Sequence, residues 1–273
     1  MTWQDVARRD LRSVYRSRLG PAVAILTLAF TVGSVALMAY LSNGYRPDTD
    51  QAVLVLSSVL SFVVPLMALL SSYSAIVGER TTGSVRFLLG LPNSRAEAFL
   101  GKFVSRSVVV LAPLAAGMFG ATVVVEGFYQ GGSFAAVPVI ALVSAILALL
   151  FVGFGLTASA MADTDTQAVS LAVGIYAVLR AGWPVAQWLG TRHLDYADPK
   201  PEWYFWFGRI NPLNAYIRVT DVLRPEMYHP LITRTSELDS VILSPEFALV
   251  VLACWTISVP LVGLAYFRQR DML

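Results

Sequence analysis

Few side chains in this chain of 273 residues could do chemistry, and their spacing matches no catalytic or metal-binding pattern. The two histidines, His193 and His229, are far apart, and the single cysteine, Cys254, lies in an apolar run. A zinc site needs histidine or cysteine ligands at short spacing, and a serine protease inside a membrane needs a histidine in a membrane span. The sequence meets neither condition. We therefore expect no catalytic residue and no metal site in this chain.

Two glycine-containing segments match nucleotide-binding loops only in part. The first ends in Gly101 and Lys102, but Ala96 stands where a P-loop has its first glycine, and Phe103 replaces the hydroxyl residue after the lysine. The second, Gly-Phe-Gly at 153–155, begins like a dinucleotide fingerprint but lies in an apolar run with no strand before it. We expect no cofactor-binding residue in this chain.

Charge inside a membrane span is the remaining pointer to a functional site. Only Arg180 stands well inside a predicted span, close to Gly182, Trp183 and Pro184, which could mark the true end of that helix. The simplest interpretation is that Arg180 snorkels toward the outer interface or pairs with Glu126. The alternative is a polar site within the membrane.

The composition indicates the class of protein that must position these residues. Hydrophobic residues make up 56% of the chain and charged residues 14%, with a mean hydropathy of +0.63. In soluble domains about a quarter of the residues are charged. The first twenty residues hold no apolar core with a cleavage site, so we expect no signal peptide. The chain is predicted to be an all-α integral membrane protein with a single domain over residues 1–273.

Six apolar runs approach the length of about 20 residues that a helix needs to cross a bilayer. Small residues recur at four-residue spacing within them, for example Gly155 with Ser159, which favours close helix packing. The predicted spans are Pro21–Leu41, Ala52–Val77, Ala98–Val125, Phe134–Met161, Thr166–Leu189 and Pro245–Phe267.

Residues 1–20 are predicted to form an interfacial helix in the headgroup region, after which Gly20 and Pro21 turn the chain into the bilayer. One face of this helix is apolar and the other basic. The apolar face holds Trp3, Val6, Ala7, Leu11, Val14 and Tyr15, and the basic face holds Arg8, Arg9, Arg12 and Arg16.

The connector between the second and third spans, residues 79–102, is the most patterned polar stretch. Its apolar residues Val85, Leu88 and Leu89 share one face of a short helix, because they fall at i, i+3 and i+4. A glycine and a proline shortly afterwards end that helix. A short amphipathic helix with charged flanks suits a groove on another protein, so we expect a coupling helix here.

The third span has a clear start signal. Ser94 and Glu97 have the spacing of a capping box, in which each side chain bonds the backbone N–H of the other residue. A new helix should therefore begin at Ser94 and continue into the apolar run.

This connector resembles the loop between the second and third membrane helices of ABC-2 type exporter permeases. That loop carries Glu, Gly, a Leu-Leu pair, Pro, Ser-Arg and Gly-Lys, in this order. The matching residues are Glu79, Gly83, Leu88, Leu89, Pro92, Ser94, Arg95, Gly101 and Lys102, and with Val85 and Glu97 they form the expected ATPase-coupling set. Within the family the pattern is similar to single-domain permeases such as those that serve nitrous-oxide-reductase maturation.

The resemblance implies partners for this chain, and it implies export as the direction of transport. A separate cytoplasmic ABC ATPase would bind ATP and magnesium and dock on the connector, while this chain would hold no cofactor. The permease would form a homodimer or pair with a second permease in the lipid bilayer, and no nucleic acid would be involved. The family also has short external helices between its fifth and sixth spans.

The distribution of basic residues predicts the orientation. The N-terminal segment, the 79–102 connector and the C-terminal tail hold eleven lysines and arginines, whereas residues 42–51 and 126–133 hold only Arg46. By the positive-inside rule, both termini and the connector face the cytoplasm of a multi-pass cell-membrane protein.

The segment 190–244 is then external. It contains the aromatic run 203–207, typical of a membrane interface, and a helical pattern over Leu213–Leu223 that is too short to span. This helix could be re-entrant or lie on the surface, and a small external packing domain is the alternative.

Together these observations predict the permease subunit of an exporter-type ATP-binding cassette complex, and not an enzyme. A non-transporting scaffold or sensor that recruits a cytoplasmic partner through the same loop is the alternative. A transporter driven by ion gradients usually places acids at the bilayer midplane, and the acids here lie at or beyond the span ends.

Overall fold

The computed structural model describes residues 2–81, 94–131, 135–193, 201–223 and 241–269. These parts are helical and contain no β-strand. The helices are α1 (Trp3–Arg16), α2 (Leu19–Leu41), α3 (Thr49–Ser72), α4 (Val77–Thr81), α6 (Arg95–Phe128), α7 (Ala136–Met161), α8 (Asp165–Ala177), α9 (Trp183–Thr191), α10 (Glu202–Ile210), α11 (Pro212–Asp221) and α12 (Pro245–Gln269), with a π-helix, η1 (Val178–Gly182), and a 3-10 turn, η2 (Val241–Leu243).

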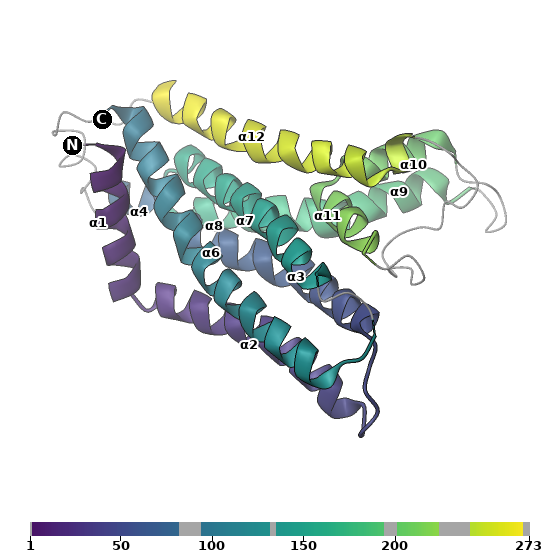
Figure 1. Cartoon of the computed structure of the whole chain (residues 1–273). Coiled ribbons are helices and arrows are strands. Elements are labelled where there is room, and N and C mark those ends of the chain that lie inside the picture. The colour runs from purple at the N-terminus through teal and green to yellow at the C-terminus, as the bar shows by residue number, and fades with distance from the viewer. Residues whose placement is uncertain (1, 82–93, 132–134, 194–200, 224–240, 270–273) are drawn as a thin grey trace.

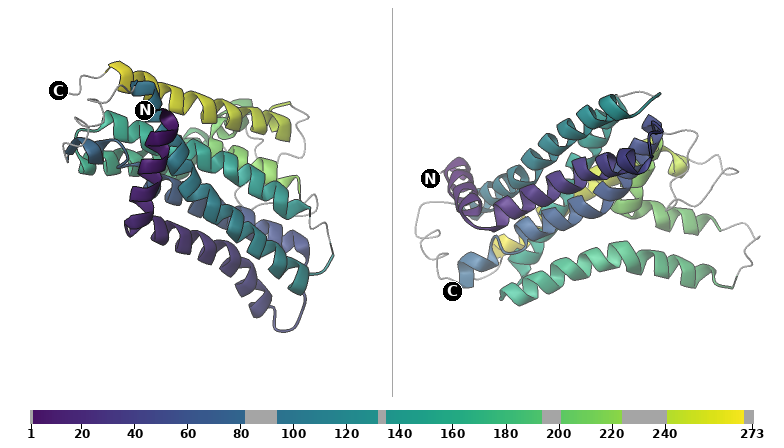
Figure 2. Two further views of the ribbon diagram at one scale, coloured as in Figure 1. Left: turned by 60° about the vertical axis from the view of Figure 1, so that its left-hand side comes forward. Right: turned by 90° about the horizontal axis from the view of Figure 1, so that it is seen from below.

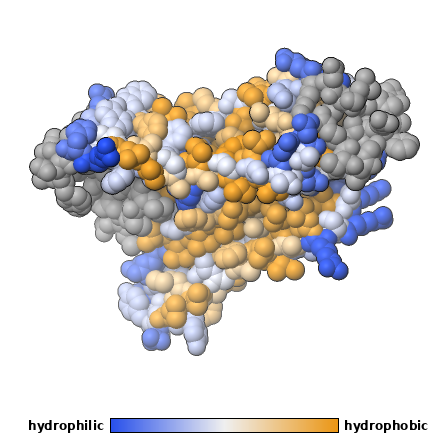
Figure 3. Space-filling model, turned by 180° about the vertical axis from the view of Figure 1, so that it is seen from behind, coloured by the Kyte–Doolittle hydropathy of each residue, from blue (hydrophilic) through white to orange (hydrophobic). Residues whose placement is uncertain are grey.

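Six helical runs in the described residues are long and apolar enough to cross a membrane. They are α2, α3 continued through α4, α6, α7, α8 continued through α9, and α12. The start of α1 and the C-terminal end of α12 lie at one end of this bundle, called the terminal end below (Figure 1). A broad hydrophobic band crosses the face seen from behind, and hydrophilic residues gather toward its ends (Figure 3). The prediction of an all-α membrane protein with six spans is confirmed.

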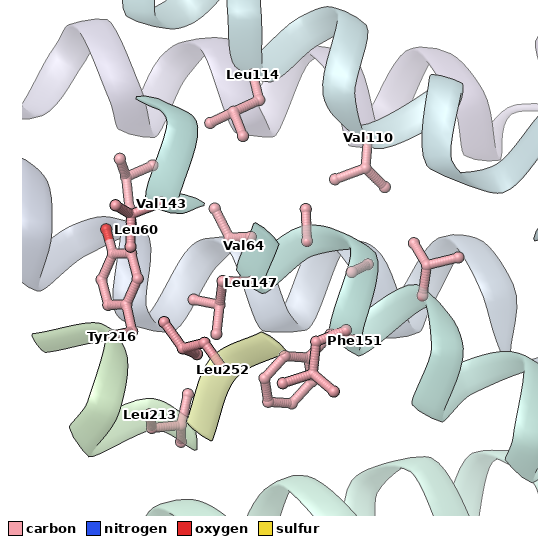
Figure 4. Close-up of a cluster of buried hydrophobic side chains, with 14 of the residues drawn as sticks. Leu60, Val64, Val110, Leu114, Val143, Leu147, Phe151, Leu213, Tyr216 and Leu252 are labelled. Atoms are coloured by element: carbon pink, nitrogen blue, oxygen red, sulfur yellow. The ribbon is translucent and has the colours of Figure 1, made fainter. Parts of the chain in front are cut away.

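Helix α7 lies at the centre of the core, and its side chains meet those of α3, α6, α11 and α12 (Figure 4). Leu147 and Phe151 of α7 are fully buried. Gly153 allows Pro260 of α12 to approach so closely that an added Cβ would lie 2.8 Å from the proline ring. Gly155 likewise packs directly against Ser72 at the end of α3. In a membrane the hydrophobic effect does not drive helices together. Small residues favour their association there because they let the helices approach closely.

The N-terminal helix α1 ends at Arg16, and α2 begins at Leu19. The predicted position of the turn, at Gly20 and Pro21, is therefore wrong by a few residues, because the chain turns between Arg16 and Leu19. Both residues lie in the first turn of α2, where proline is tolerated because its missing N–H would have no helical partner.

The fifth span continues past the point where Gly182, Trp183 and Pro184 could have ended it. The chain passes from α8 through the π-helix η1 into α9 and stays helical to Thr191. A π-turn fits this position, because Pro184 lacks an N–H and its ring crowds the carbonyl four residues earlier.

The segment 190–244, which is predicted to be external, contains the helices α10 and α11. Helix α11 buries Leu213, Tyr216, Ile217 and Thr220 of the predicted face and packs against α3, α7 and α12. The Tyr216 hydroxyl lies 2.9 Å from the hydroxyl of Ser144, well inside α7. Helix α11 is therefore inserted among the spanning helices. This agrees with the re-entrant alternative and not with a helix lying on the surface.

Candidate functional site

The second span is interrupted near the terminal end. The sequence predicts one helix to Val77, but α3 ends at Ser72 and the short α4 begins only at Val77. The hydroxyl of Ser159, on α7, accepts hydrogen bonds from the backbone N–H groups of Ile76 (2.9 Å) and Val77 (3.0 Å). A helix can break inside a bundle when neighbouring side chains satisfy the freed backbone groups, and here a serine does so.

Lys102 of α6 holds the same break from the other side. Its side chain is 2% exposed, and its ammonium donates to the carbonyl oxygen of Ala75 at 2.7 Å. The ammonium also lies 2.7 Å from a carboxylate oxygen of Glu79, in α4, and 3.6 Å from Asp10 in α1. Lys102 therefore links the two ends of the predicted connector, Glu79 before it and α6 after it.

One turn further along α6, Arg106 makes a bidentate ion pair with Asp10. Its Nε and Nη2 atoms donate to the two carboxylate oxygens at 2.8 and 2.9 Å, and Nη1 donates to the carbonyl oxygen of Ser71 at 2.7 Å. Ser105 also donates to Asp10. All these side chains are buried. We call Asp10, Glu79, Lys102 and Arg106 the ionic cluster.

The charge of Asp10 is stabilised within this cluster. Burial alone would raise the pKa of its carboxyl, but the nearby Lys102 and Arg106, with hydrogen bonds from Arg106 and Ser105, outweigh burial and lower the pKa below 3.8. Buried charges persist in proteins when they are paired and hydrogen-bonded in this way. The cluster therefore joins α1, the α3–α4 break and α6 through charged contacts.

Gly101 brings α1 and α6 together. A Cβ at this position would lie 2.7 Å from both the Trp3 carbonyl oxygen and the Val6 Cβ atom. One face of α1 packs on α6, with Val6, Asp10 and Val14 buried. The position of α1 in the headgroup region stays a prediction. The Gly-Lys pair thus has two local roles: the glycine permits the approach of α1, and the lysine joins the ionic cluster.

Helix α6 begins as predicted. The Ser94 hydroxyl accepts from the Glu97 N–H at 3.2 Å, and the Glu97 carboxylate accepts from the Ser94 N–H at 2.9 Å. The predicted capping box is confirmed. Arg95 adds hydrogen bonds to the carbonyl oxygens of Phe267 (3.4 Å) and Arg268 (2.8 Å), at the end of α12. The start of α6 is therefore fixed to the last helix as well.

The structure brings together part of the predicted coupling set. Glu79 and Lys102 form an ion pair, while Ser94, Arg95, Glu97 and Gly101 occupy the first two turns of α6 or its cap. The predicted coupling helix falls outside the described residues, as do Gly83, Val85, Leu88, Leu89 and Pro92.

Two members of the ionic cluster were not among the predicted site residues. Asp10 was overlooked because the helical wheel separated apolar from basic residues, although its spacing from Val6 and Val14 places it on the buried face. Arg106 corrects the statement that only Arg180 stands well inside a predicted span, because it lies within Ala98–Val125 and is 7% exposed. A lone charge in an apolar run was the available signal.

Arg180 lies in η1 and contacts α3. Its Nη2 atom donates to the Ser61 hydroxyl at 3.2 Å, and its Cζ atom lies 3.2 Å from the centre of the Phe62 ring. The side chain is partly buried. The expected alternatives, snorkelling to the interface or pairing with Glu126, are not what the structure has.

Among the described residues, no group of three or more histidine, cysteine, aspartate or glutamate side chains could hold a metal ion. The side chains gathered at the terminal end make charged and backbone contacts between helices. Their arrangement can transmit movement, because displacing Lys102 or Arg106 breaks bonds to two or more other elements.

Comparison with known proteins gives a consistent result. Residues 4–272 match a family described as ABC-2 family transporter protein. A relative in Stutzerimonas stutzeri, described as a probable ABC transporter permease protein NosY, is 28% identical over 218 residues, covering 78% of each chain. A protein of the same description in Pseudomonas aeruginosa is 26% identical over 220 residues, covering 77% of this chain and 78% of the relative.

Proposed function

The chain belongs to the ABC-2 family of transporter proteins, and from that premise we propose that it couples export across the membrane to a separate ATP-binding subunit. The chain is the membrane permease of the complex. The partner binds ATP and magnesium and docks on the connector between Glu79 and Lys102. Export, as the direction, rests on the resemblance of that connector to exporter permeases.

The ion pair between Glu79 and Lys102 is the observation that supports this proposal best. The two residues flank the connector and are joined at 2.7 Å. Because Lys102 is also bonded to the α3–α4 break and lies beside Asp10, a displacement of the connector would move three spanning or interfacial elements together. An isolated loop would absorb the same displacement.

The mechanism is a shift between two packings of the spans. ATP binding closes the partner ATPases, the connectors move with them, and α6 transmits the movement because its first turn is fixed by the capping box. Helix α6 is 34 residues long and leads from the connector to the opposite end of the bundle. A push at its start therefore reaches the full depth of the membrane.

The test is a charge placed on the predicted docking face. Leu88→Asp puts a carboxylate where an apolar side chain enters the ATPase groove, so co-purification with the ATPase and ATP-dependent transport should fall while membrane insertion is unchanged. The matched control is Val241→Asp, which changes an exposed apolar residue in η2. Undiminished co-purification in Leu88→Asp would remove the docking assignment.

The same experiment separates the transporter from the scaffold. A scaffold that recruits a partner through this loop would also lose co-purification in Leu88→Asp, but the wild-type complex would not move any substrate when ATP is hydrolysed. The gene beside this one gives an earlier indication, because an adjacent P-loop ATPase favours the transporter.

A further inference from the structure

Arg180 places a positive charge near the middle of the bundle. It reaches from η1 to Ser61 and Phe62, which lie near the midpoint of α3 (Thr49–Ser72). Since α3 belongs to a spanning run, its midpoint lies deep in the hydrocarbon region and not at the headgroups. Charges at this depth are costly and usually face a partner or a pathway.

No counter-charge for Arg180 is found in the described part of the chain. The ion pairs there join other residues, and the contacts of Arg180 are a neutral hydroxyl and an aromatic ring. A guanidinium has five N–H donors in one plane. Stacking on Phe62 covers one face of that plane, so the N–H groups along its edge can still meet an acceptor.

A polar group without a hydrogen-bond partner lies one turn away from Arg180. Tyr176 precedes Arg180 by four residues and therefore shares its side of the helix. Its hydroxyl is buried and has no hydrogen-bond partner in the described residues. A buried hydroxyl is normally paired, so the Tyr176 hydroxyl can donate to an acceptor that no described residue supplies.

The backbone around Arg180 is held in an uncommon form. Val178–Gly182 is a π-helix, a form often found at functional sites. The side-chain amide of Asn211, at the start of α11, donates to the carbonyl oxygen of Leu179 at 2.7 Å. Trp183 donates to the Phe207 carbonyl oxygen at 2.7 Å. Residues of α10 and of the start of α11 thus hold the π-helix η1 in place, and the position of η1 determines where the Arg180 side chain projects.

We propose that Arg180 and Tyr176 form a binding site, midway across the membrane, for an anionic oxygen-bearing group such as a carboxylate, phosphate or sulfate of the transported substrate. This inference rests on the proposed transport function and specifies its substrate class. The ligand accepts in-plane hydrogen bonds from the guanidinium and one from the tyrosine hydroxyl. Helices α8 and α9 lie along one side of the bundle (Figure 2).

The phosphate of a lipid headgroup has the same chemistry as the proposed ligand. The depth of the site in the bilayer distinguishes a lipid headgroup from the transported substrate. Phospholipid headgroups lie at the bilayer surfaces, whereas Ser61 lies near the midpoint of a spanning helix. A substrate group crossing the membrane must pass that level, so the substrate is the assigned ligand.

The test uses radiolabelled inorganic sulfate as the probe. The permease, purified with its ATPase, is placed in nanodiscs of phosphatidylcholine alone, and equilibrium binding is measured. Arg180→Gln should weaken binding by about tenfold or more, because a charged hydrogen-bonding partner is lost. Arg180→Lys should be intermediate, because the charge stays and the planar fork is lost. Arg192→Gln, at an exposed arginine just after α9, should bind as wild type.

Three outcomes would overturn the site: absence of saturable sulfate binding, equal binding in Arg180→Gln, or equal loss in Arg192→Gln. A second arm adds phosphatidylglycerol. If that lipid displaces sulfate and co-purifies in an Arg180-dependent way, the ligand is a lipid phosphate and the substrate assignment is wrong. ATPase co-purification is scored in the same preparations, so a failure of the proposed function is recorded separately from a failure of the site.

Discussion

Asp10 is the acid beside two buried cations, Lys102 and Arg106. Replacing it by asparagine leaves Arg106 without its ion-pair partner in a buried place. Breaking a buried pair in this way costs about 3–5 kcal/mol. We expect Asp10→Asn to lower the midpoint of unfolding in detergent, whereas Glu126→Gln, at an exposed acid of α6, should change stability by less than about 0.5 kcal/mol. Equal midpoints for the two variants would contradict a stabilising role for the cluster.

The same residue gives a pH dependence with a definite sign. The folded-state pKa of Asp10 is lowered below 3.8, so its contribution is fully present above that value and is lost as pH falls through the folded pKa. Wild-type protein should therefore lose stability below about pH 4, the ordinary range of an aspartate, more steeply than Asp10→Asn does. Unfolding midpoints across an acid series measure this, and parallel curves would count against it.

At this scale the sequence predicts local chemistry better than long-range contacts. The Ser94–Glu97 box was predictable because its two members are three residues apart. The partners Asp10 and Arg106 lie 96 positions apart in sequence. The sequence pattern around either residue does not indicate that the other is its partner, so the ionic cluster could be recognised only from the three-dimensional structure.

At the scale of elements, α6 transmits movement only if its first turn is rigid. Ser94→Ala should cost about 0.5–2 kcal/mol of local helix stability. Glu97→Ala should have a related effect, and the double variant should be less than additive because both changes remove the same reciprocal bonds. We expect less transport per ATP hydrolysed, with the complex still assembled. Full stoichiometry in both single variants would mean that the box only starts the helix.

The spanning helices were predictable because each needs an uninterrupted apolar run. Their interruptions were not. The α3–α4 break lies within the predicted span Ala52–Val77, and its freed backbone groups are satisfied by Ser159 and Lys102 from other helices. The insertion of α11 was left open for the same reason, since its burial depends on α3, α7 and α12.

At the scale of the whole molecule, the orientation is still a prediction from charge. In a background that replaces Cys254, whose side chain is exposed, cysteines introduced near Asp198 and Glu237 should react with an impermeant reagent added outside. A cysteine at Ser94 should react only after the membrane is opened. The reverse pattern would overturn the orientation and the docking of an ATPase at the terminal end.

The docking of α1 on α6 has a consequence for how the protein is made. Helix α1 leaves the ribosome before α6, and Arg106 is synthesised 96 residues after Asp10, roughly 5–20 s later at about 5–20 residues per second. Until then the Asp10 carboxylate lacks its buried cation partners, and α1 lacks the α6 surface on which it packs. Helix α1 therefore waits for the third span to be inserted, and during that interval a chaperone or protease can reach it.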